Sequence, residues 1–242
     1  MAWFFESEEI KTEHHQITGE NARHITKSLR MKVGEHLTLC TLDGKRHECV
    51  ITEILNDTVN VKILSSTVCE QEPDIKVTLF VALLKGDKFD DVIQKSVELG
   101  VYEIIPFISA RCISRPEKKQ IIKKCGRWQK IAENAASQSR RAIIPKVRDC
   151  ISINDTDDIL KDFDKSIVFY ECGGEKLKDL VKETDKKIAL ITGCEGGFEK
   201  SEIDMLKSAG VKVATLGKRI LRAQTAPIAA LCSVMFISGN LE

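Results

Sequence analysis

Three short segments of the sequence combine glycines with charged side chains, and each directly follows an apolar run. They are residues 170–174 (YECGG), 193–198 (GCEGGF) and 216–225 (LGKRILRAQT). Glycine has no Cβ, so it lets a backbone turn sharply and approach a ligand closely. The pattern predicts a ligand site built from these segments. A plain strand-to-helix turn is the alternative interpretation of residues 193–197.

The carboxylate in the second segment indicates the charge of the ligand. Glu195 would repel a phosphate, and neither GxxxxGK[ST] nor GxGxxG, the two common phosphate-binding patterns, occurs in the chain. We therefore expect a ligand that carries a positive group. Ser201, or a residue just before it, is expected to cap the helix that follows.

The elements that position these segments alternate between strands and helices. Strands are expected at residues 76–83, 102–108, 143–147, 166–171, 187–192 and 211–216. Helices are expected at residues 87–99, 116–138, 176–181, 201–209 and 225–238. Such alternation predicts an α/β fold with a mostly parallel sheet and helices on both faces. Ligands of such sheets collect beyond the carboxyl ends of the strands, where all three glycine-containing segments lie.

Residues 1–72 have a different pattern, with strands expected at 37–42, 46–55 and 59–64 and one helix at 20–29. Arg23, Lys27 and Arg30 share one face of that helix, which is either an RNA-binding or a merely solvated surface. The polar stretch at residues 69–74 predicts a boundary between a β domain, 1–72, and an α/β domain, 73–242.

The long helix at 116–138 has two distinct faces. At 100° per residue, Lys119, Lys123, Arg127 and Lys130 lie on one side, and the opposite side, with Trp128, is apolar. We therefore expect Trp128 in the core, and the basic side either at phosphates or in solvent. Residues 73–148 hold 16 Lys and Arg against eight Asp and Glu, so an anionic partner would be attracted here.

Composition excludes several other classes. The nine cysteines form no CxxC pair and the five histidines are dispersed, so we expect no metal site and mostly buried thiols. No apolar stretch is long enough to span a membrane, and the acidic start of the chain does not resemble a secretion signal. The expected location is the cytoplasm.

Five ordered blocks, spread over nearly the whole chain, resemble the ribosomal RNA small subunit methyltransferase E family of the SPOUT class. The blocks are residues 23–35, 93–100, 128–145, 193–202 and 216–226. The resemblance implies a PUA-like RNA-binding β-barrel in residues 1–72 and a SPOUT methyltransferase domain with a deep trefoil knot in residues 73–242. It also implies a homodimer paired through the knot domain. The activity implied is S-adenosylmethionine-dependent methylation of uridine N3 in 16S ribosomal RNA near the decoding region, on free RNA or the 30S subunit.

The resemblance assigns roles to particular residues. Those expected to bind the cofactor are Tyr170, Glu171, Gly193, Cys194, Glu195, Gly196, Gly197, Leu216, Gly217, Ile220, Leu221 and Arg222. Those expected to bind RNA are Arg23, Lys27, Arg30, Arg111 and Arg140. The expected catalytic residues are Arg222 first and Arg219 second, because a guanidinium would stabilise negative charge that develops on the uracil oxygens. Glu195 would take the N3 proton or position the amino group of the cofactor. A structural ion pair at the dimer interface is the alternative role for Arg222.

Two positions depart from the family pattern. Cys194 replaces a proline, which removes rigidity from the glycine segment, and Gln224 replaces a glutamate that could have acted as a base. The alternatives are a SPOUT methyltransferase acting on a ribose 2′-hydroxyl or a guanine, and a non-catalytic RNA-binding or ribosome-assembly factor. A nucleotide-binding dehydrogenase is disfavoured because the phosphate patterns are missing.

Overall fold

The computed structural model describes residues 2–41 and 43–241 and contains two compact units. The first comprises the chain as far as Glu72 together with Ala136–Ile144, and the second comprises Pro73–Ala135 and the chain from Pro145 onward. Residues 136–144, which lie inside the predicted α/β domain, are thus part of the first unit. Leu42, the last residue of a predicted strand, lies outside the described residues.

The first unit is built on a five-stranded sheet with the order β1-β3-β4-β5-β2. The strands are β1 (Ala2–Glu6), β2 (His14–Ile17), β3 (His36–Thr41), β4 (Lys45–Leu55) and β5 (Thr58–Val68). β1 runs parallel to β3, and the other pairs are antiparallel. The turn between β3 and β4 is closed by Gly44, whose N–H donates to Thr41 O at 3.0 Å and whose φ is +76°.

A short helix covers the core of this sheet. α1 (Gly19–Arg23) continues into the π-helical turn η1 (His24–Ser28). Its buried residues Ala22 and Ile25 pack with Leu37 and Leu39 of β3, which point to the same face because strand side chains alternate. The helix predicted at residues 20–29 is present, and its exposed side carries Arg23 and Lys27. Arg30, predicted on the same face, instead follows the end of η1 at Ser28 and has a φ of +54°.

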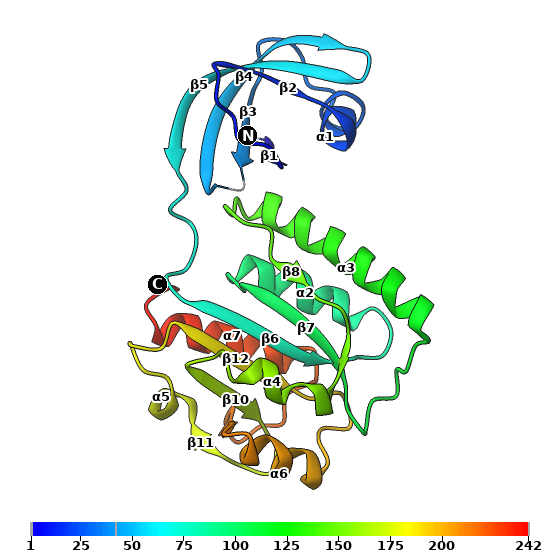
Figure 1. Ribbon diagram of the computed structural model, residues 1–242, viewed down its shortest axis with the longest axis vertical. Coiled ribbons are helices and arrows are strands. Elements are labelled where there is room, and N and C mark those ends of the chain that lie inside the picture. Colours follow the sequence, from blue (N-terminus) through cyan, green and yellow to red (C-terminus); the bar gives the residue numbers. More distant parts are fainter. Residues whose placement is uncertain (1, 42, 242) are drawn as a thin grey trace. The chain divides into compact units, whose positions relative to one another are not determined.

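The second unit contains a parallel sheet with the order β11-β13-β10-β12-β6-β7-β8, and β9 also pairs with β7 (Figure 1). The strands are β6 (Lys76–Ala82), β7 (Glu103–Ile108), β8 (Lys146–Val147), β9 (Ile151–Ser152), β10 (Lys165–Phe169), β11 (Glu175–Lys176), β12 (Lys187–Thr192) and β13 (Lys212–Thr215). Every pair among these described strands is parallel, as the apolar runs predicted.

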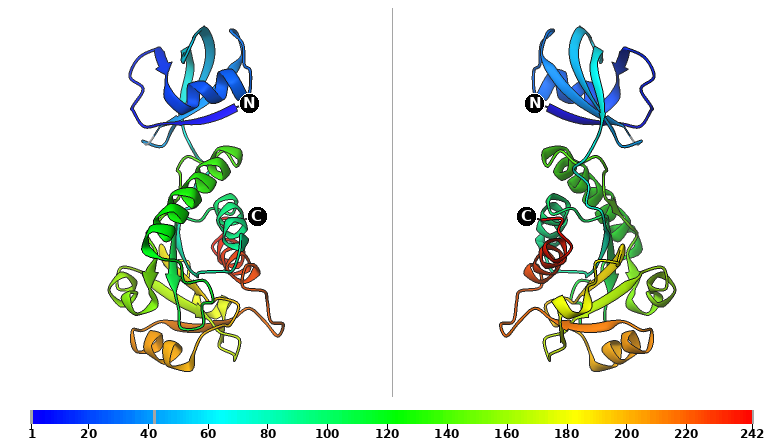
Figure 2. Two further views of the ribbon diagram at one scale, coloured as in Figure 1. Left: turned by 90° about the vertical axis from the view of Figure 1, so that its right-hand side faces the viewer. Right: turned by 90° about the vertical axis from the view of Figure 1, so that its left-hand side faces the viewer.

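Helices connect these strands. They are α2 (Lys88–Glu98), α3 (Lys118–Gln138), η2 (Ile153–Asp155), α4 (Asp157–Leu160), α5 (Leu177–Leu180), α6 (Lys200–Ser208) and α7 (Thr225–Ile237). Figure 2 shows α2 and α7 together on one side of the sheet and α4 on the other. The α/β class with a mostly parallel sheet is confirmed.

The faces of α3 follow the helical periodicity. Trp128 is buried and packs on Phe89 of α2 with a ring-centroid distance of 4.3 Å, and its Nε1 donates to Asp90 at 3.0 Å. Arg127, from the basic face, reaches the same carboxylate and donates through Nη2 to Asp90 Oδ1 at 2.8 Å. The basic face is therefore partly neutralised by α2.

The strand predicted at 143–147 is shorter in the structure, and the reason is local. The N–H groups of Ala142 and Ile143 both donate to the Glu72 carboxylate, at 2.8 and 3.2 Å, and Arg141 forms an ion pair with it. Because Glu72 holds this backbone, the sheet begins only at Lys146.

Candidate functional site

The three glycine-containing segments meet at one edge of the second unit. β13, β10 and β12 are adjacent and parallel, so the loops after their carboxyl ends emerge side by side (Figure 1). They enclose a hollow of about 600 Å³, within the range of about 300–1,000 Å³ typical of ligand pockets. All twelve residues assigned to the cofactor line it, as do Lys88, Phe169, Phe198, Thr215, Lys218, Arg219, Ala223, Gln224 and Ala226. That these twelve residues bind the cofactor stays a prediction, but the structure brings them together around one hollow.

A side chain at the glycines of the loop at residues 193–197 would press against neighbouring groups. A Cβ on Gly193 would lie 3.0 Å from the Phe198 ring, and one on Gly197, where φ is +67°, would lie 2.5 Å from Glu171 Oε1. The loop is closed by a hydrogen bond from Gly197 N–H to Cys194 O at 2.9 Å. Phe198 is buried and stacks on Phe107 of β7, which anchors the loop to the core. The glycines therefore shape one wall of the hollow.

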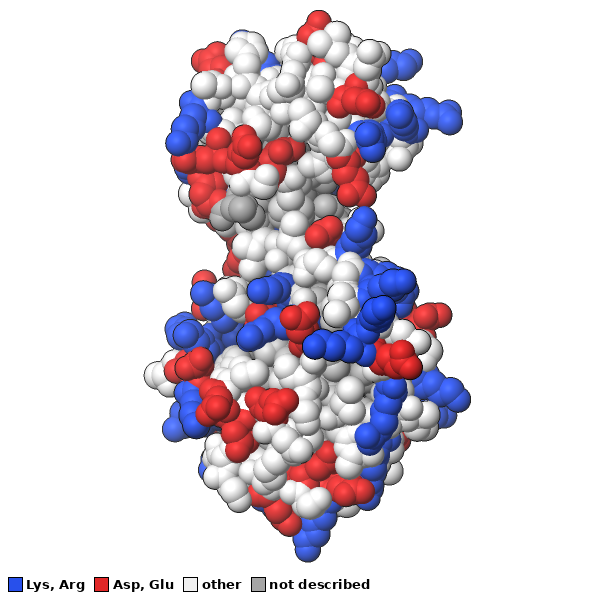
Figure 3. All heavy atoms as spheres, turned by 45° about the vertical axis from the view of Figure 1, so that its right-hand side comes forward, with Lys and Arg blue, Asp and Glu red and all other residues white. Residues whose placement is uncertain are grey.

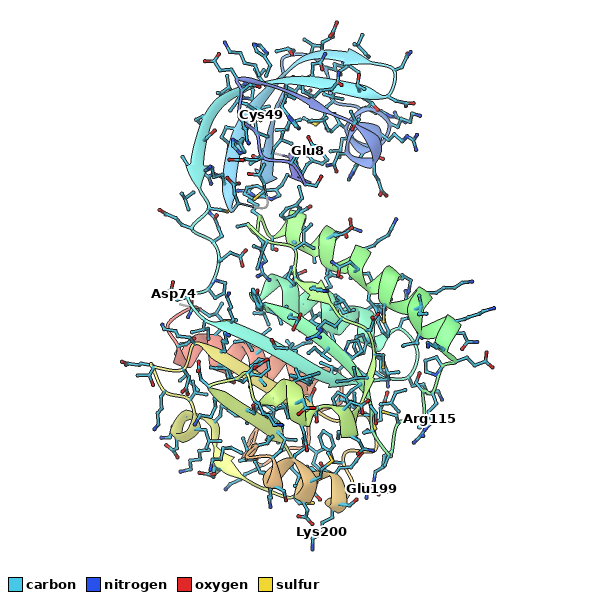
Figure 4. All side chains as sticks on the ribbon, viewed as in Figure 1. Glu8, Cys49, Asp74, Arg115, Glu199 and Lys200 are labelled. Carbon is cyan, nitrogen blue, oxygen red and sulfur yellow. The ribbon has the colours of Figure 1, made fainter. Side chains whose placement is uncertain are left out.

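The helix after this loop is capped as its sequence suggested. Glu199 is the N-cap of α6, and it forms a reciprocal capping box with Glu202 (Figure 4 labels Glu199 and Lys200 at this helix start). Glu202 is buried. Its Oε2 accepts from Glu199 N–H at 2.9 Å, and its Oε1 accepts from Ala110 N–H at 2.8 Å. Glu202 thus ties the loop after β7 to the loop after β12.

Glu195 is not a free carboxylate. Its Oε1 accepts from Lys88 Nζ at 2.9 Å and from Lys85 N–H at 3.2 Å. Burial alone would raise the pKa of Glu195, but these hydrogen bonds outweigh it and hold the pKa below its ordinary value. A carboxylate so stabilised in its charged form is a weak proton acceptor. Glu195 alone therefore does not select a cationic ligand, because Lys88 already neutralises its charge.

Lys88 was missed by the sequence analysis. It opens α2, in the connection that follows β6, and reaches the hollow because β6 is the neighbour of β12. Only strand order brings the two loops together, and no local signal in the sequence gives that order.

The side chains of Glu171 and Gln224 are more available to a ligand than the side chain of Glu195. Glu171 is exposed at the hollow, and its side chain makes no hydrogen bond or ion pair within the described residues. Gln224 precedes α7, and its Oε1 is enclosed without a hydrogen-bond partner in the part of the chain that is described. A buried acceptor without a donor costs about 1–3 kcal/mol, so a ligand donor at Gln224 would be favourable.

The two candidate catalytic arginines line the same hollow. Both are exposed, and within residues 2–41 and 43–241 neither guanidinium has a hydrogen bond or an ion pair. Arg222 is held by backbone geometry, since its carbonyl accepts from Thr225 and Ala226 N–H at 2.8 and 3.0 Å. The guanidinium is thus uncommitted on a backbone fixed to the start of α7.

The five residues assigned to RNA binding are divided between the units. Arg23, Lys27, Arg30 and Arg140 are exposed in the first unit, and Lys27 lies 3.9 Å from Asp57. Arg111 belongs to the second unit and donates through Nη1 to Gly196 O at 3.0 Å, so it also supports the glycine loop. On the face drawn in Figure 3, Lys and Arg side chains of the second unit gather along α3.

The described residues also bear on the presence of a metal site or a membrane span. They contain no group of three or more His, Cys, Asp or Glu that could hold a metal ion. They also contain no helix both long and apolar enough to cross a membrane.

Comparison with known proteins gives consistent matches. Residues 70–235 match the family described as RNA methyltransferase domain, and residues 17–64 match the RNA methyltransferase PUA domain. The ribosomal RNA small subunit methyltransferase E of Bacillus subtilis is 35% identical over 91% of this chain and 89% of its own length. That of Mesomycoplasma hyopneumoniae is 33% identical over 76% of this chain and 79% of its own. The crystal structure of the Neisseria gonorrhoeae enzyme bound to S-adenosyl methionine superposes with a TM-score of 0.90, at 31% identity over 98% of each chain.

Proposed function

Because the chain belongs to the ribosomal RNA small subunit methyltransferase E family, we propose that it methylates N3 of a uridine in 16S ribosomal RNA, near the decoding region, with S-adenosylmethionine as donor. The supporting observation is the glycine-lined hollow that also contains the uncommitted guanidinium of Arg222. The proposed place of action is the cytoplasm, on ribosomal RNA or the 30S subunit.

The residues around the hollow fit this cofactor. When bound, it supplies an electrophilic methyl group on a sulfonium. The twelve assigned residues would hold it, with the glycine loop offering backbone groups and no side chains that fill the space. The uncommitted Glu171 carboxylate and the unpartnered Gln224 Oε1 are acceptors suited to the amino and hydroxyl donors of such a ligand.

The chemical difficulty lies in the N3 proton of uracil. As it leaves, negative charge spreads over the O2 and O4 oxygens, and a fixed guanidinium nearby stabilises that charge and lowers the pKa of N3–H. Arg222 is the first choice for this role and Arg219 the second. Glu195 is a poor base because of Lys88, and the amide of Gln224 cannot accept a proton to become charged. We therefore propose that the proton leaves to water and that Arg222 makes its loss easier.

RNA binding and pairing of subunits complete the proposal. Arg23, Lys27, Arg30, Arg111 and Arg140 would contact phosphates, which position the RNA. Two copies would pair through the methyltransferase domain, whose trefoil knot remains a prediction. In support of pairing, α7 contains no charged residue, and Phe236 on it and Ile220 before it are 69% and 85% exposed.

Arg222→Ala tests the chemical role. Removing one donor to a developing oxyanion costs roughly 10²- to 10³-fold in kcat. Cofactor affinity measured by calorimetry should fall less, because the other assigned residues of the hollow still hold the cofactor. Transfer of labelled methyl groups to 30S subunits that lack the modification gives the rate, and Arg222→Lys reports what a point charge alone restores. Arg148→Ala is the control, because Arg148 pairs with Glu103 near the opposite edge of the sheet.

Two outcomes would contradict the proposal separately. Unchanged transfer by Arg222→Ala would remove this residue from the chemistry. Nucleoside analysis that finds a methylated ribose or guanine instead of 3-methyluridine would replace the target while leaving the cofactor assignment in place.

A further inference from the structure

Two thiols from different loops meet behind the wall of the hollow. Cys112 lies in the loop after β7 and Cys194 in the glycine loop after β12, and both are buried. The Cys194 thiol interacts directly with Cys112. Ser109 bridges the pair, with its Oγ 3.3 Å from Cys112 Sγ and 3.9 Å from Cys194 Sγ.

The surroundings of Cys112 favour its thiolate. The Ser109 N–H donates to Cys112 Sγ at 3.3 Å, and the Ser109 Oγ lies 3.3 Å from the same sulfur. The contact with Cys194, opposed by burial, lowers the pKa of Cys112. The pKa of Cys194 is raised by the same contact. These contacts favour the charged form of Cys112 over that of Cys194, which is the order that a nucleophilic thiol and its resolving partner require.

The loops that carry the two thiols are already fixed to each other. Glu202 accepts from Ala110 N–H, and Arg111 donates to Gly196 O at 3.0 Å. Arg115, labelled in Figure 4, donates to Ala110 O at 2.7 Å and to Cys112 O at 3.2 Å. The loops that carry the two thiols are thus joined by hydrogen bonds, which keep the two thiols near each other.

Two other thiol pairs lack this activation. Cys40 interacts with Cys69 in the first unit, and Cys125 lies beside Cys150 in the second. Burial raises the pKa of all four thiols, to about 12 for Cys40 and Cys150. These pairs are internal controls, because they place two sulfurs together without a stabilised thiolate.

We propose that Cys112 and Cys194 are an oxidation site, in which hydrogen peroxide converts the pair to a disulfide that alters the cofactor hollow. Cys112 Sγ, as the thiolate, attacks one peroxide oxygen and the O–O bond breaks, so Cys112 becomes a sulfenic acid. The leaving hydroxide takes from solvent the proton that Cys112 released, and becomes water. Cys194 Sγ then attacks Cys112 Sγ, the S–O bond breaks, and the hydroxyl leaves as water with the Cys194 proton. Two thiols are oxidised by two electrons, and one peroxide is reduced to two waters.

The disulfide would change the shape of the hollow through Cys194. The two sulfurs must approach to about 2.05 Å, which moves Cys194 Sγ from its place 3.7 Å from Gly197 O. Cys194 lines the hollow, so the glycine wall shifts with it. The effect on the cofactor rests on the proposed function, whereas the oxidation itself does not.

Mass spectrometry tests the oxidation directly. After a peroxide titration, we expect the intact mass to fall by two hydrogens and the linked peptides to map to Cys112 and Cys194. The product should be absent from Cys112→Ser and unaffected in Cys125→Ser. If both thiols can still be alkylated at a peroxide concentration that oxidises the exposed Cys172, or if all three pairs cross-link equally, the proposal is overturned.

Calorimetry then tests the coupling. Affinity for S-adenosylmethionine should fall about tenfold or more on oxidation, because a displacement of about 1 Å in the glycine wall misplaces the groups that contact the ligand. It should return with dithiothreitol, and peroxide should not change it in Cys112→Ser. Unchanged affinity of the disulfide form would overturn the coupling. A reduced protein that binds no cofactor would count against the proposed function, and hydrogen exchange of residues 193–197 in the reduced and disulfide forms would then decide whether the wall moves.

Discussion

Replacing Gly197 by alanine tests whether the missing side chain at this position leaves room for the Glu171 carboxylate at the hollow. The added Cβ would lie 2.5 Å from Glu171 Oε1, at a φ of +67°. A residue with a Cβ in the left-handed region costs roughly 1–2 kcal/mol. The Glu171 carboxylate ends a flexible, exposed side chain, so it can swing away at little further cost. We expect Gly197→Ala to lower the free energy of unfolding by about 1–2 kcal/mol and to displace Glu171.

Gly210→Ala is the matched control for backbone strain. Gly210 has a φ of +86°, and a Cβ there would meet nothing within 4 Å. Gly210 lies just after α6, whereas Gly197 lies just before this helix. Gly210 does not line the hollow. Its alanine variant should therefore lose a similar free energy of unfolding, about 1–2 kcal/mol, without touching the site.

Urea denaturation and calorimetry with S-adenosylmethionine separate strain from function. We expect equal losses of stability in the two variants and a loss of cofactor affinity only in Gly197→Ala. Adding Glu171→Ala to Gly197→Ala should reduce affinity little further, because both changes remove the same carboxylate. Equal cofactor affinity in the two glycine variants would refute the reasoning that links Gly197 to Glu171.

Three further predictions follow from single side chains. Lys88→Met removes the ion pair of Glu195, whose pKa should rise. The ion pair holds the pKa of Glu195 below its ordinary value of 4.5, so it stabilises the folded protein above that pH. The difference in unfolding free energy between Lys88→Met and the parent should therefore vanish as the pH falls through the folded pKa of Glu195. Urea denaturation at a series of acidic pH values would show this. Glu171→Gln should weaken cofactor binding about tenfold or more in calorimetry, and Glu195→Gln should weaken it less. Trp128→Ala should cost about 3–5 kcal/mol of unfolding free energy in urea, because the ring is 2% exposed against Phe89; a loss under about 1 kcal/mol would contradict this packing.

The longer elements of the second unit could be predicted because their signals are local, whereas the short elements β9, β11, η2 and α4 were not predicted. The strand at Lys187–Thr192 is an uninterrupted apolar run, and the glycines after it mark its end. Trp128 could be placed in the core from its position on α3 alone. The strands β1 and β2 were missed because their partners, β3 and β5, lie tens of residues away and nothing within the short strands indicates them.

The site was predictable as a set of loops but not as a set of contacts. Residues of loops after adjacent parallel strands must meet, so the hollow follows from the class of fold. The pairing of Lys88 with Glu195 depends on β6 lying next to β12, and the contact of Cys112 with Cys194 depends on β7 lying one strand further. Strand order is a property of the whole chain, so these contacts had no local signal.

The charges around the hollow argue for two ligands of different charge sharing one site. Lys88 neutralises Glu195, which leaves Glu171 as the carboxylate of the hollow without a partner in the described residues. On the loop after β13, Lys218, Arg219 and Arg222 are exposed, and their side chains make no ion pair within residues 2–41 and 43–241. The hollow as a whole is therefore positive, and its net charge would repel a sulfonium. A cationic cofactor must then be held locally, by Glu171 and by the backbone of the glycine loop. The surplus cations are free to attract the phosphates of RNA and to stabilise negative charge on the base that receives the methyl group.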